Sequence, residues 1–151
     1  MVTLTVDERL FAAYMFYGGI LVLKTFLMSF LTARQRIKNQ VLPSPEDYGD
    51  KNKGKPIPTS EDVERVRRAH RNDLENIPIF LIIALLYTLL NLPPVRGIWC
   101  LRIFTAARIL HTVAYLNGIS KPRGIGFIGG SICLGILVVS VLYSAVIAGV
   151  F

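Results

Sequence analysis

The chain has 151 residues and a formal net charge of +7, and 52% of its residues are hydrophobic. Its mean hydropathy of +0.49 is too high for a soluble domain of this size, so the composition predicts a single membrane domain over residues 1–151. Most basic residues lie beside the apolar runs, a pattern that membrane topology explains better than binding to nucleic acid, so we expect no nucleic-acid partner.

Four apolar runs predict an all-α membrane protein with a bundle of four transmembrane helices. The first run has no basic segment or small-residue cleavage site before it, so we expect it to remain as an anchor. Prolines and lysines in the first connection argue against regular structure there, apart from a turn at Ser44-Pro45-Glu46-Asp47. The expected spans are residues 10–32, 75–92, 95–116 and 125–150, and the first connection is expected at about residues 33–60.

The first span contains a lysine, Lys24. A charged side chain inside a bilayer is costly and normally faces the bundle interior or reaches toward the interface. We therefore interpret Lys24 as a structural lysine that is paired within the bundle.

A densely charged segment, residues 64–76, runs without a break into the second span. On a helical wheel with Arg68 at zero, Arg71 falls at about −60°, Asn72 at about +40° and Glu75 at about −20°. These four side chains therefore share one stripe that continues into the membrane, where charges need partners. Side chains off this stripe or at its edge are expected on a solvated face: Arg65, Arg67 and Asp73.

The third span carries Arg108, His111 and Tyr115 at positions i, i+3 and i+7, which places them on one face of a helix. The fourth span has no charged residue, and its glycines at 126, 129 and 130 predict close packing between helices. Two cysteines, Cys100 and Cys133, lie within the last two spans and are predicted to be buried small residues.

The distribution of lysine and arginine predicts the topology. The segment from Arg34 to Arg71 contains ten such residues, whereas only Arg9 precedes the first span. The first connection should therefore be cytoplasmic, with both termini on the opposite side. The charged stripe and the Arg108–Tyr115 face then approach the same cytoplasmic edge, which predicts one polar pocket between the helices.

The expected pocket offers several cations, one or two carboxylates, a phenol and an imidazole. The sequence has no metal-ligand spacing, no arrangement for a nucleophilic side chain and no phosphate-binding glycine loop, so we expect no metal. These groups suit an anionic, peptide-like ligand, and cations beside a bound thiol would raise its thiolate fraction. A thiol cofactor therefore fits the pocket.

The motifs of the second and third helices resemble those of the MAPEG superfamily, membrane-associated proteins in eicosanoid and glutathione metabolism. The second-helix motif is residues 63–76, and the third-helix motif is Arg108-Ile109-Leu110-His111-Thr112-Val113-Ala114-Tyr115. Ser44-Pro45-Glu46-Asp47 is similar to an Asn-Pro-Glu-Asp segment of that family. The motifs look like those of the branch that holds microsomal glutathione transferases and prostaglandin E synthases.

This resemblance implies a homotrimer of four-helix subunits in the endoplasmic reticulum membrane, with glutathione as the cofactor near the cytosolic face. Each site residue could instead belong to a structural ion pair, and this alternative stays open. Carried over by motif position, the residues that hold glutathione would be Arg36, Arg68, Arg71, Asn72, Glu75, Arg108, His111 and Tyr115.

One position departs from the pattern of this branch. Relatives have an activating arginine nine residues after the tyrosine of the third-helix motif, a position that is Gly124 here, with Arg123 one residue earlier. We expect Arg123 to act as the catalytic thiolate stabiliser, with Asp47 as its partner.

The implied activity is conjugation of glutathione to lipophilic electrophiles that enter from the membrane lipid, with peroxide reduction as a side activity. The alternatives are a glutathione-dependent prostaglandin E synthase and a non-catalytic lipid- or glutathione-binding protein of the same fold.

Overall fold

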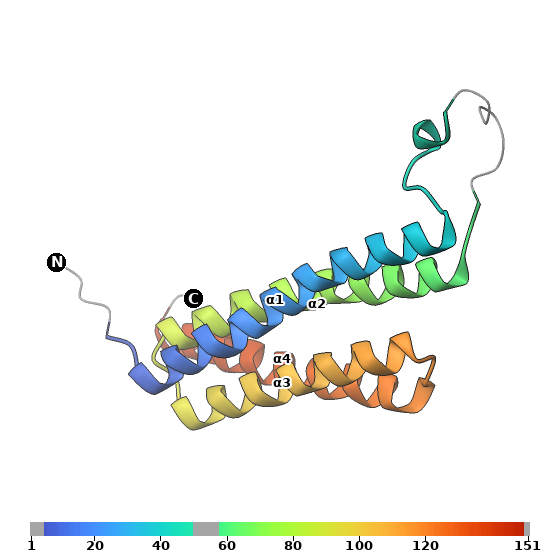
Figure 1. The fold of residues 1–151 in the computed structure, drawn as a ribbon. Coiled ribbons are helices and arrows are strands. Elements are labelled where there is room, and N and C mark those ends of the chain that lie inside the picture. The colour runs from blue at the N-terminus through green and yellow to red at the C-terminus, as the bar shows by residue number, and fades with distance from the viewer. Residues whose placement is uncertain (1–4, 50–57, 150–151) are drawn as a thin grey trace.

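The computed structural model describes residues 5–49 and 58–149, and its regular structure over these ranges is entirely helical (Figure 1). The predicted all-α, four-helix architecture is therefore confirmed. Lys51, Lys53, Lys55 and Pro56 of the first connection, and residue 150 at the expected end of the fourth span, lie outside the described residues. The elements are α1 (Glu8–Asn39), the short 3-10 helix η1 (Pro45–Tyr48), α2 (Glu61–Leu89), α3 (Pro94–Leu116) and α4 (Ser120–Ile147).

Helix boundaries follow local capping chemistry. The Asp7 side chain accepts a hydrogen bond of 2.8 Å from the backbone N–H of Leu10 and so caps α1. The helix continues beyond residue 32 to Asn39, because basic side chains in its last turn complement the helix dipole. It ends at Gln40, which adopts a left-handed φ of 54°. Helix α3 begins at Pro94, where a missing backbone N–H costs nothing.

Three of the four long helices, α1, α2 and α4, are long and apolar enough to cross a membrane. Helix α3 is not among the described helices that are both long enough and apolar enough to cross a membrane. Its three arginines, Arg96, Arg102 and Arg108, lower its hydropathy, so its place in a membrane depends on its neighbours.

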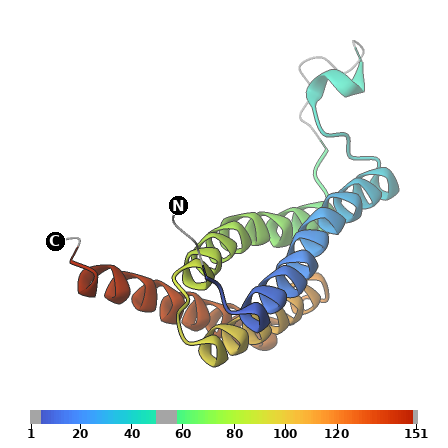
Figure 2. The same cartoon turned by 90° about the vertical axis from the view of Figure 1, so that its left-hand side faces the viewer.

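The helices form a bundle in which α1 packs on α2 and α3, and α4 packs on α3 and α2 (Figures 1 and 2). The α1–α2 connection and the α3–α4 turn lie at the same end of the bundle. The α2–α3 turn and the start of α1 lie at the other end, where the backbone N–H of Asp7 donates to Asn91 Oδ1 at 3.2 Å. Residues from the predicted polar motifs therefore gather near one end.

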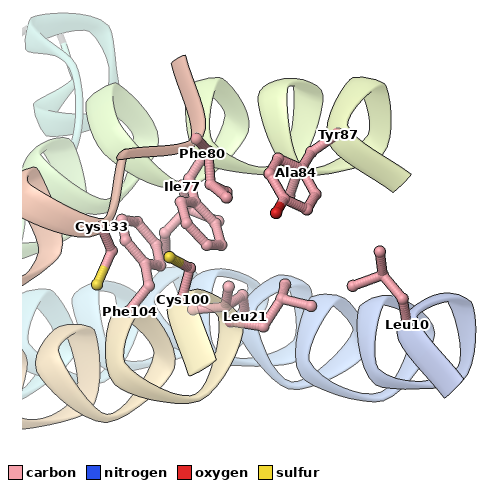
Figure 3. Packing of buried hydrophobic residues seen from close by; sticks show 11 residues of the cluster. Leu10, Leu21, Ile77, Phe80, Ala84, Tyr87, Cys100, Phe104 and Cys133 are labelled. Carbon is pink, nitrogen blue, oxygen red and sulfur yellow. The ribbon is translucent and has the colours of Figure 1, made fainter. Parts of the chain in front are cut away.

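The apolar core lies between the helices and extends from Tyr87, near the α2–α3 turn, to Phe104 and Cys133 (Figure 3). Phe80 of α2 and Phe104 of α3 are fully buried and stack with ring centroids 3.6 Å apart. Cys100 and Cys133 are buried and free, which confirms their prediction as small core residues. Burial of these side chains is the main stabilising contribution within the subunit.

Glycines of α4 let it approach α3 closely. A Cβ atom at Gly126 would lie 2.7 Å from the carbonyl oxygen of Ala107, and one at Gly130 would lie 2.9 Å from Arg108 Nη2. The predicted close packing is thus confirmed at these two positions, whereas at Gly129 the nearest atom would be 3.9 Å away. No described residue of α4 after Leu137 is buried, and Figure 2 shows this part of α4 diverging from the other helices.

Candidate functional site

A buried ion pair joins α1 to α2 in the bundle interior. Lys24 Nζ lies 2.6 Å from Asp73 Oδ2, and the two side chains are 13% and 0% exposed. The prediction that Lys24 is paired within the bundle is confirmed. The prediction that Asp73 lies on a solvated face is wrong. Asp73 falls about 140° from Arg68 on the helical wheel, and this sector is the one that α1 covers.

The sequence did contain a signal for the burial of Asp73. A lysine inside a membrane bundle is stabilised by a carboxylate partner. Because the rest of the first span has no acidic residue, the partner of Lys24 is expected on another helix. Asp73 lies close to the membrane-length part of α2, so it was a candidate for this partner.

A second buried contact joins α2 to α3. Arg108 is fully buried, and its Nη1 donates a hydrogen bond of 2.9 Å to Asn72 Oδ1. Its guanidinium carbon lies 5.2 Å from the centroid of Phe104 and 5.9 Å from that of Phe127. The absence of a side chain at Gly130 leaves room for this guanidinium. The two predicted polar faces therefore meet at Asn72 and Arg108.

Successive turns of α3 carry this polar region toward the end of the bundle. The rings of His111 and Tyr115 have centroids 5.6 Å apart. The Arg123 guanidinium, at the start of α4, lies 4.8 Å from the Tyr115 ring centroid. Arg68 of α2 pairs with Glu61 at 2.5 Å and also interacts with the side chain of Tyr115. Three helices thus contribute to one cationic, aromatic cluster.

Several buried polar atoms in this region have no hydrogen-bond partner among the described residues. They include Nε and Nη2 of Arg108 and Nδ1 of His111. Unpaired buried donors cost free energy, so they mark a place where a polar ligand or ordered water would be stabilised. We define the polar site as Arg68, Asn72, Arg108, His111, Tyr115 and Arg123.

Other predicted site residues do not join the polar site within this subunit. Arg71 and Glu75 form an exposed pair at 3.7 Å, with side chains 75% and 60% exposed. Arg36, on α1, lines a mostly apolar pocket of about 620 Å³ beside η1. The predicted residues therefore do not all meet in one site within the described subunit.

Asp47 is engaged within its own turn. Its Oδ2 accepts a hydrogen bond of 3.1 Å from the backbone N–H of Ser44, which forms a capping box at η1. Both views place η1 away from the start of α4, so the structure does not bring Asp47 to Arg123 in one subunit (Figures 1 and 2).

A groove follows the outer side of α1 and α2. Its polar part is a pocket of about 250 Å³. The next pocket, of about 420 Å³, shares His70 and Leu74 with it and is lined mainly by apolar side chains such as Phe26 and Leu81. The groove is therefore amphipathic along its length. The residues that line its polar part are Thr32, Glu64, Arg67, Arg68, His70, Arg71 and Leu74.

Comparison with known proteins places this arrangement in a family. The model of the MAPEG family matches residues 14–143. The chain is 46% identical to microsomal glutathione S-transferase 1 of Mus musculus over 129 residues, which cover 82% of this chain and 83% of that protein. It is 44% identical to microsomal glutathione S-transferase 1 of Homo sapiens, with coverage of 86% and 88%. It is 30% identical to prostaglandin E synthase of Homo sapiens, with coverage of 80% and 79%. The chain belongs to the MAPEG family.

Proposed function

We propose that this protein is a membrane-bound glutathione transferase that conjugates glutathione to lipophilic electrophiles. The single observation that carries the proposal is the polar site, where cations from α2, α3 and α4 lie around the half-buried phenol of Tyr115 and the buried imidazole of His111. The identity of 44–46% with microsomal glutathione S-transferase 1 of two mammals supports the same reaction. Reduction of organic hydroperoxides by glutathione is proposed as a side activity.

The charge of the polar site suits thiol activation. A thiol is a weak nucleophile, and nearby guanidinium groups stabilise the thiolate relative to the thiol. In the proposed reaction, the thiol proton passes to solvent, and the thiolate sulfur forms a bond to an electrophilic carbon. When the substrate is an aryl halide, the carbon–halogen bond breaks and halide leaves. The protein contributes position and electrostatic stabilisation.

We assign proposed roles by location. Arg108 and Asn72 lie in the interior, where unpaired donors of Arg108 fit an anionic group of the bound tripeptide. Arg123, beside Tyr115 at the end of the bundle, is the proposed thiolate stabiliser. His111, Tyr115 and Arg68 complete the binding surface on this subunit.

Arg36, Arg71, Glu75 and Asp47 act, in this proposal, across a subunit interface. Arg36 is half-buried and the other three are exposed in one subunit, which supports a homotrimer in which a neighbour brings them to the polar site. Glu75 would then meet the glutathione α-amine, and Asp47 of one subunit would meet Arg123 of another. Cross-linking in native membranes tests the oligomeric state.

The membrane placement is also a proposal. All four helices span the membrane of the endoplasmic reticulum, as the word microsomal in the names of the relatives suggests. The basic first connection and the α3–α4 turn lie at one end of the bundle, and the lysine and arginine distribution favours the cytosol for this end. Lipophilic substrate enters from membrane lipid, and the apolar part of the α1–α2 groove offers a surface for it.

The test uses purified, detergent-solubilised protein at neutral pH. Ultraviolet absorbance of thiolate during a glutathione titration reports activation, and conjugation of chlorodinitrobenzene reports turnover. We expect a saturable thiolate signal, and Arg123→Ala should lower the thiolate signal and turnover by about tenfold to a hundredfold. Arg102→Ala is the matched control, because Arg102 stacks on Trp99 at 5.3 Å and lies outside the polar site. Absence of the thiolate signal in folded wild-type protein would leave a prostaglandin E synthase or a non-catalytic binding protein of the same fold.

Prostaglandin E synthase activity is the second candidate, because the chain is 30% identical to prostaglandin E synthase of Homo sapiens. The higher identity with the transferases, 46% against 30%, favours conjugation. Product analysis with a prostaglandin endoperoxide and glutathione separates the two activities.

A further inference from the structure

The buried interior holds more positive than negative charge. Three charged side chains are enclosed between the helices: Lys24 of α1, Asp73 of α2 and Arg108 of α3. One carboxylate thus faces two cations. Buried charges are costly unless they are paired, so the way in which the carboxylate is shared determines the electrostatics of this region.

The carboxylate of Asp73 pairs with Lys24. The ammonium of Lys24 lies 2.6 Å from Asp73 Oδ2, whereas Arg108 Nη1 donates a hydrogen bond of 2.9 Å to the neutral carboxamide oxygen of Asn72. Within the described ranges, Arg108 Nε and Nη2 have no partner, and neither has Asp73 Oδ1. Arg108 is therefore a buried guanidinium that no carboxylate of the described residues contacts directly.

Without Lys24, the carboxylate has an alternative partner. Asp73 directly follows Asn72, whose Oδ1 accepts a hydrogen bond of 2.9 Å from Arg108 Nη1, so the Asp73 carboxylate is carried by the part of α2 that contacts Arg108. Arg108 Nη1 donates to Asn72 of α2, and its unpartnered Nε and Nη2 lie beside Gly130 of α4, so the guanidinium has donors left for a carboxylate. Loss of the lysine would thus turn Asp73 toward Arg108 and neutralise it.

We infer that Lys24 is a positioning residue for the proposed reaction: it holds Asp73 away from Arg108 and so keeps Arg108 as an uncompensated cation that favours bound thiolate. Lys24 lies on α1 and acts through two other residues, so it has no contact with the substrate in this role. The inference rests on the proposed function, since the thiolate is the anion that benefits.

The experiment compares Lys24→Met with the double variant Lys24→Met/Asp73→Asn. The thiolate absorbance of bound glutathione is titrated against pH in purified, detergent-solubilised protein saturated with glutathione. Lys24→Met should lower the thiolate fraction at neutral pH by about tenfold, because an opposite charge now pairs with Arg108. The double variant removes one positive and one negative charge, so it should recover the wild-type titration.

The other charged or titratable groups that face the polar site are the same in all variants. These are Arg68 and its partner Glu61 from α2, His111 and Tyr115 from α3, and Arg123 from α4. Lys24→Arg keeps the charge and should titrate like the wild type. If Lys24→Met does not fold, Lys24→Gln retains a hydrogen-bond donor to Asp73 without its charge and should shift the titration in the same direction.

The outcomes are distinct. Folded Lys24→Met or Lys24→Gln protein that binds glutathione with an unchanged pH midpoint would mean a purely structural lysine and would overturn the inference. A double variant no better than Lys24→Met would overturn it as well. A wild-type protein with no thiolate signal at any pH would instead reject the proposed function, and the inference with it.

Discussion

Helix α2 carries two kinds of ion pair that look alike in sequence but lie in different surroundings. Asp73 is fully buried against Lys24 of α1, at 2.6 Å. Glu64 pairs with Arg67 on the same helix at 2.5 Å, with side chains 36% and 51% exposed. The distances are nearly equal, so geometry alone does not distinguish the two pairs. Solvation does, because water screens the exposed charges and compensates either one when its partner is lost.

The comparison separates two tasks of charge in this protein. Pairs on the exposed part of α2, such as Arg71–Glu75, are free to exchange partners with a ligand or a neighbouring subunit. The buried pair joins α1 to α2 in the bundle interior. Charge on the exposed part therefore suits recognition, and charge in the interior suits positioning.

Asp73→Ala should give the largest effect on stability. It leaves Lys24 buried without a carboxylate, and removal of one partner from a buried pair typically costs about 3 to 5 kcal/mol. Far-ultraviolet circular dichroism during denaturation, at fixed protein and detergent concentrations, measures the change in the free energy of unfolding. A loss below about 1 kcal/mol, the range of exposed pairs, would show that water or lipid headgroups reach this interior.

Glycines of α4 also differ in their surroundings: Gly126 lies in close contact with α3, whereas Gly135 has open space around it. Gly126→Ala places a Cβ atom 2.7 Å from the carbonyl oxygen of Ala107, which is backbone and has little freedom to move. We expect a cost of about 1 to 3 kcal/mol from separation of α3 and α4. Gly135→Ala is the matched control, because no atom lies within 4 Å of its added Cβ.

The control should not lower stability, since alanine is the better helix former by about 1 kcal/mol. Measurement of both variants under the same denaturation conditions isolates the contact from the propensity. Equal stability of Gly126→Ala and Gly135→Ala would contradict the close approach of α3 and α4.

The fold was predictable because its signals are local. Apolar runs long enough for a membrane, separated by prolines and charges, define four helices without knowledge of their contacts. The burial of Lys24 was also predictable, since a charged side chain within a membrane span normally faces the bundle interior. The burial of Asp73 was not predicted, because a helical wheel orders side chains around α2 but does not say which sector α1 covers.

The candidate site was predictable in part for the same reason. Spacing on α3 placed His111 and Tyr115 on one face, and the structure carries them beside Arg123. Whether Asp47 meets Arg123 depends on a connection whose path no periodicity specifies, and within one subunit Asp47 caps its own turn. Subunit interfaces leave a similar gap, because exposed side chains such as Arg71 carry no sequence mark for their partners.

Glu64→Ala should give the smallest effect and completes the comparison with Asp73→Ala. Both substitutions remove a carboxylate from α2, but Arg67 stays in contact with water after its partner is lost. Exposed pairs contribute about 0.2 to 1 kcal/mol, and the first-turn position of Glu64 adds a helix-dipole effect of similar size. We therefore expect a loss of about 1 kcal/mol or less, and the loss should shrink in high salt, as screening weakens exposed charges more than buried ones. Denaturation of both variants at low and high salt measures these losses. A salt-independent loss for Glu64→Ala, or a loss equal to that of Asp73→Ala, would mean that a neighbouring subunit encloses Glu64. Burial, rather than position along α2, would then determine the cost of losing a charge.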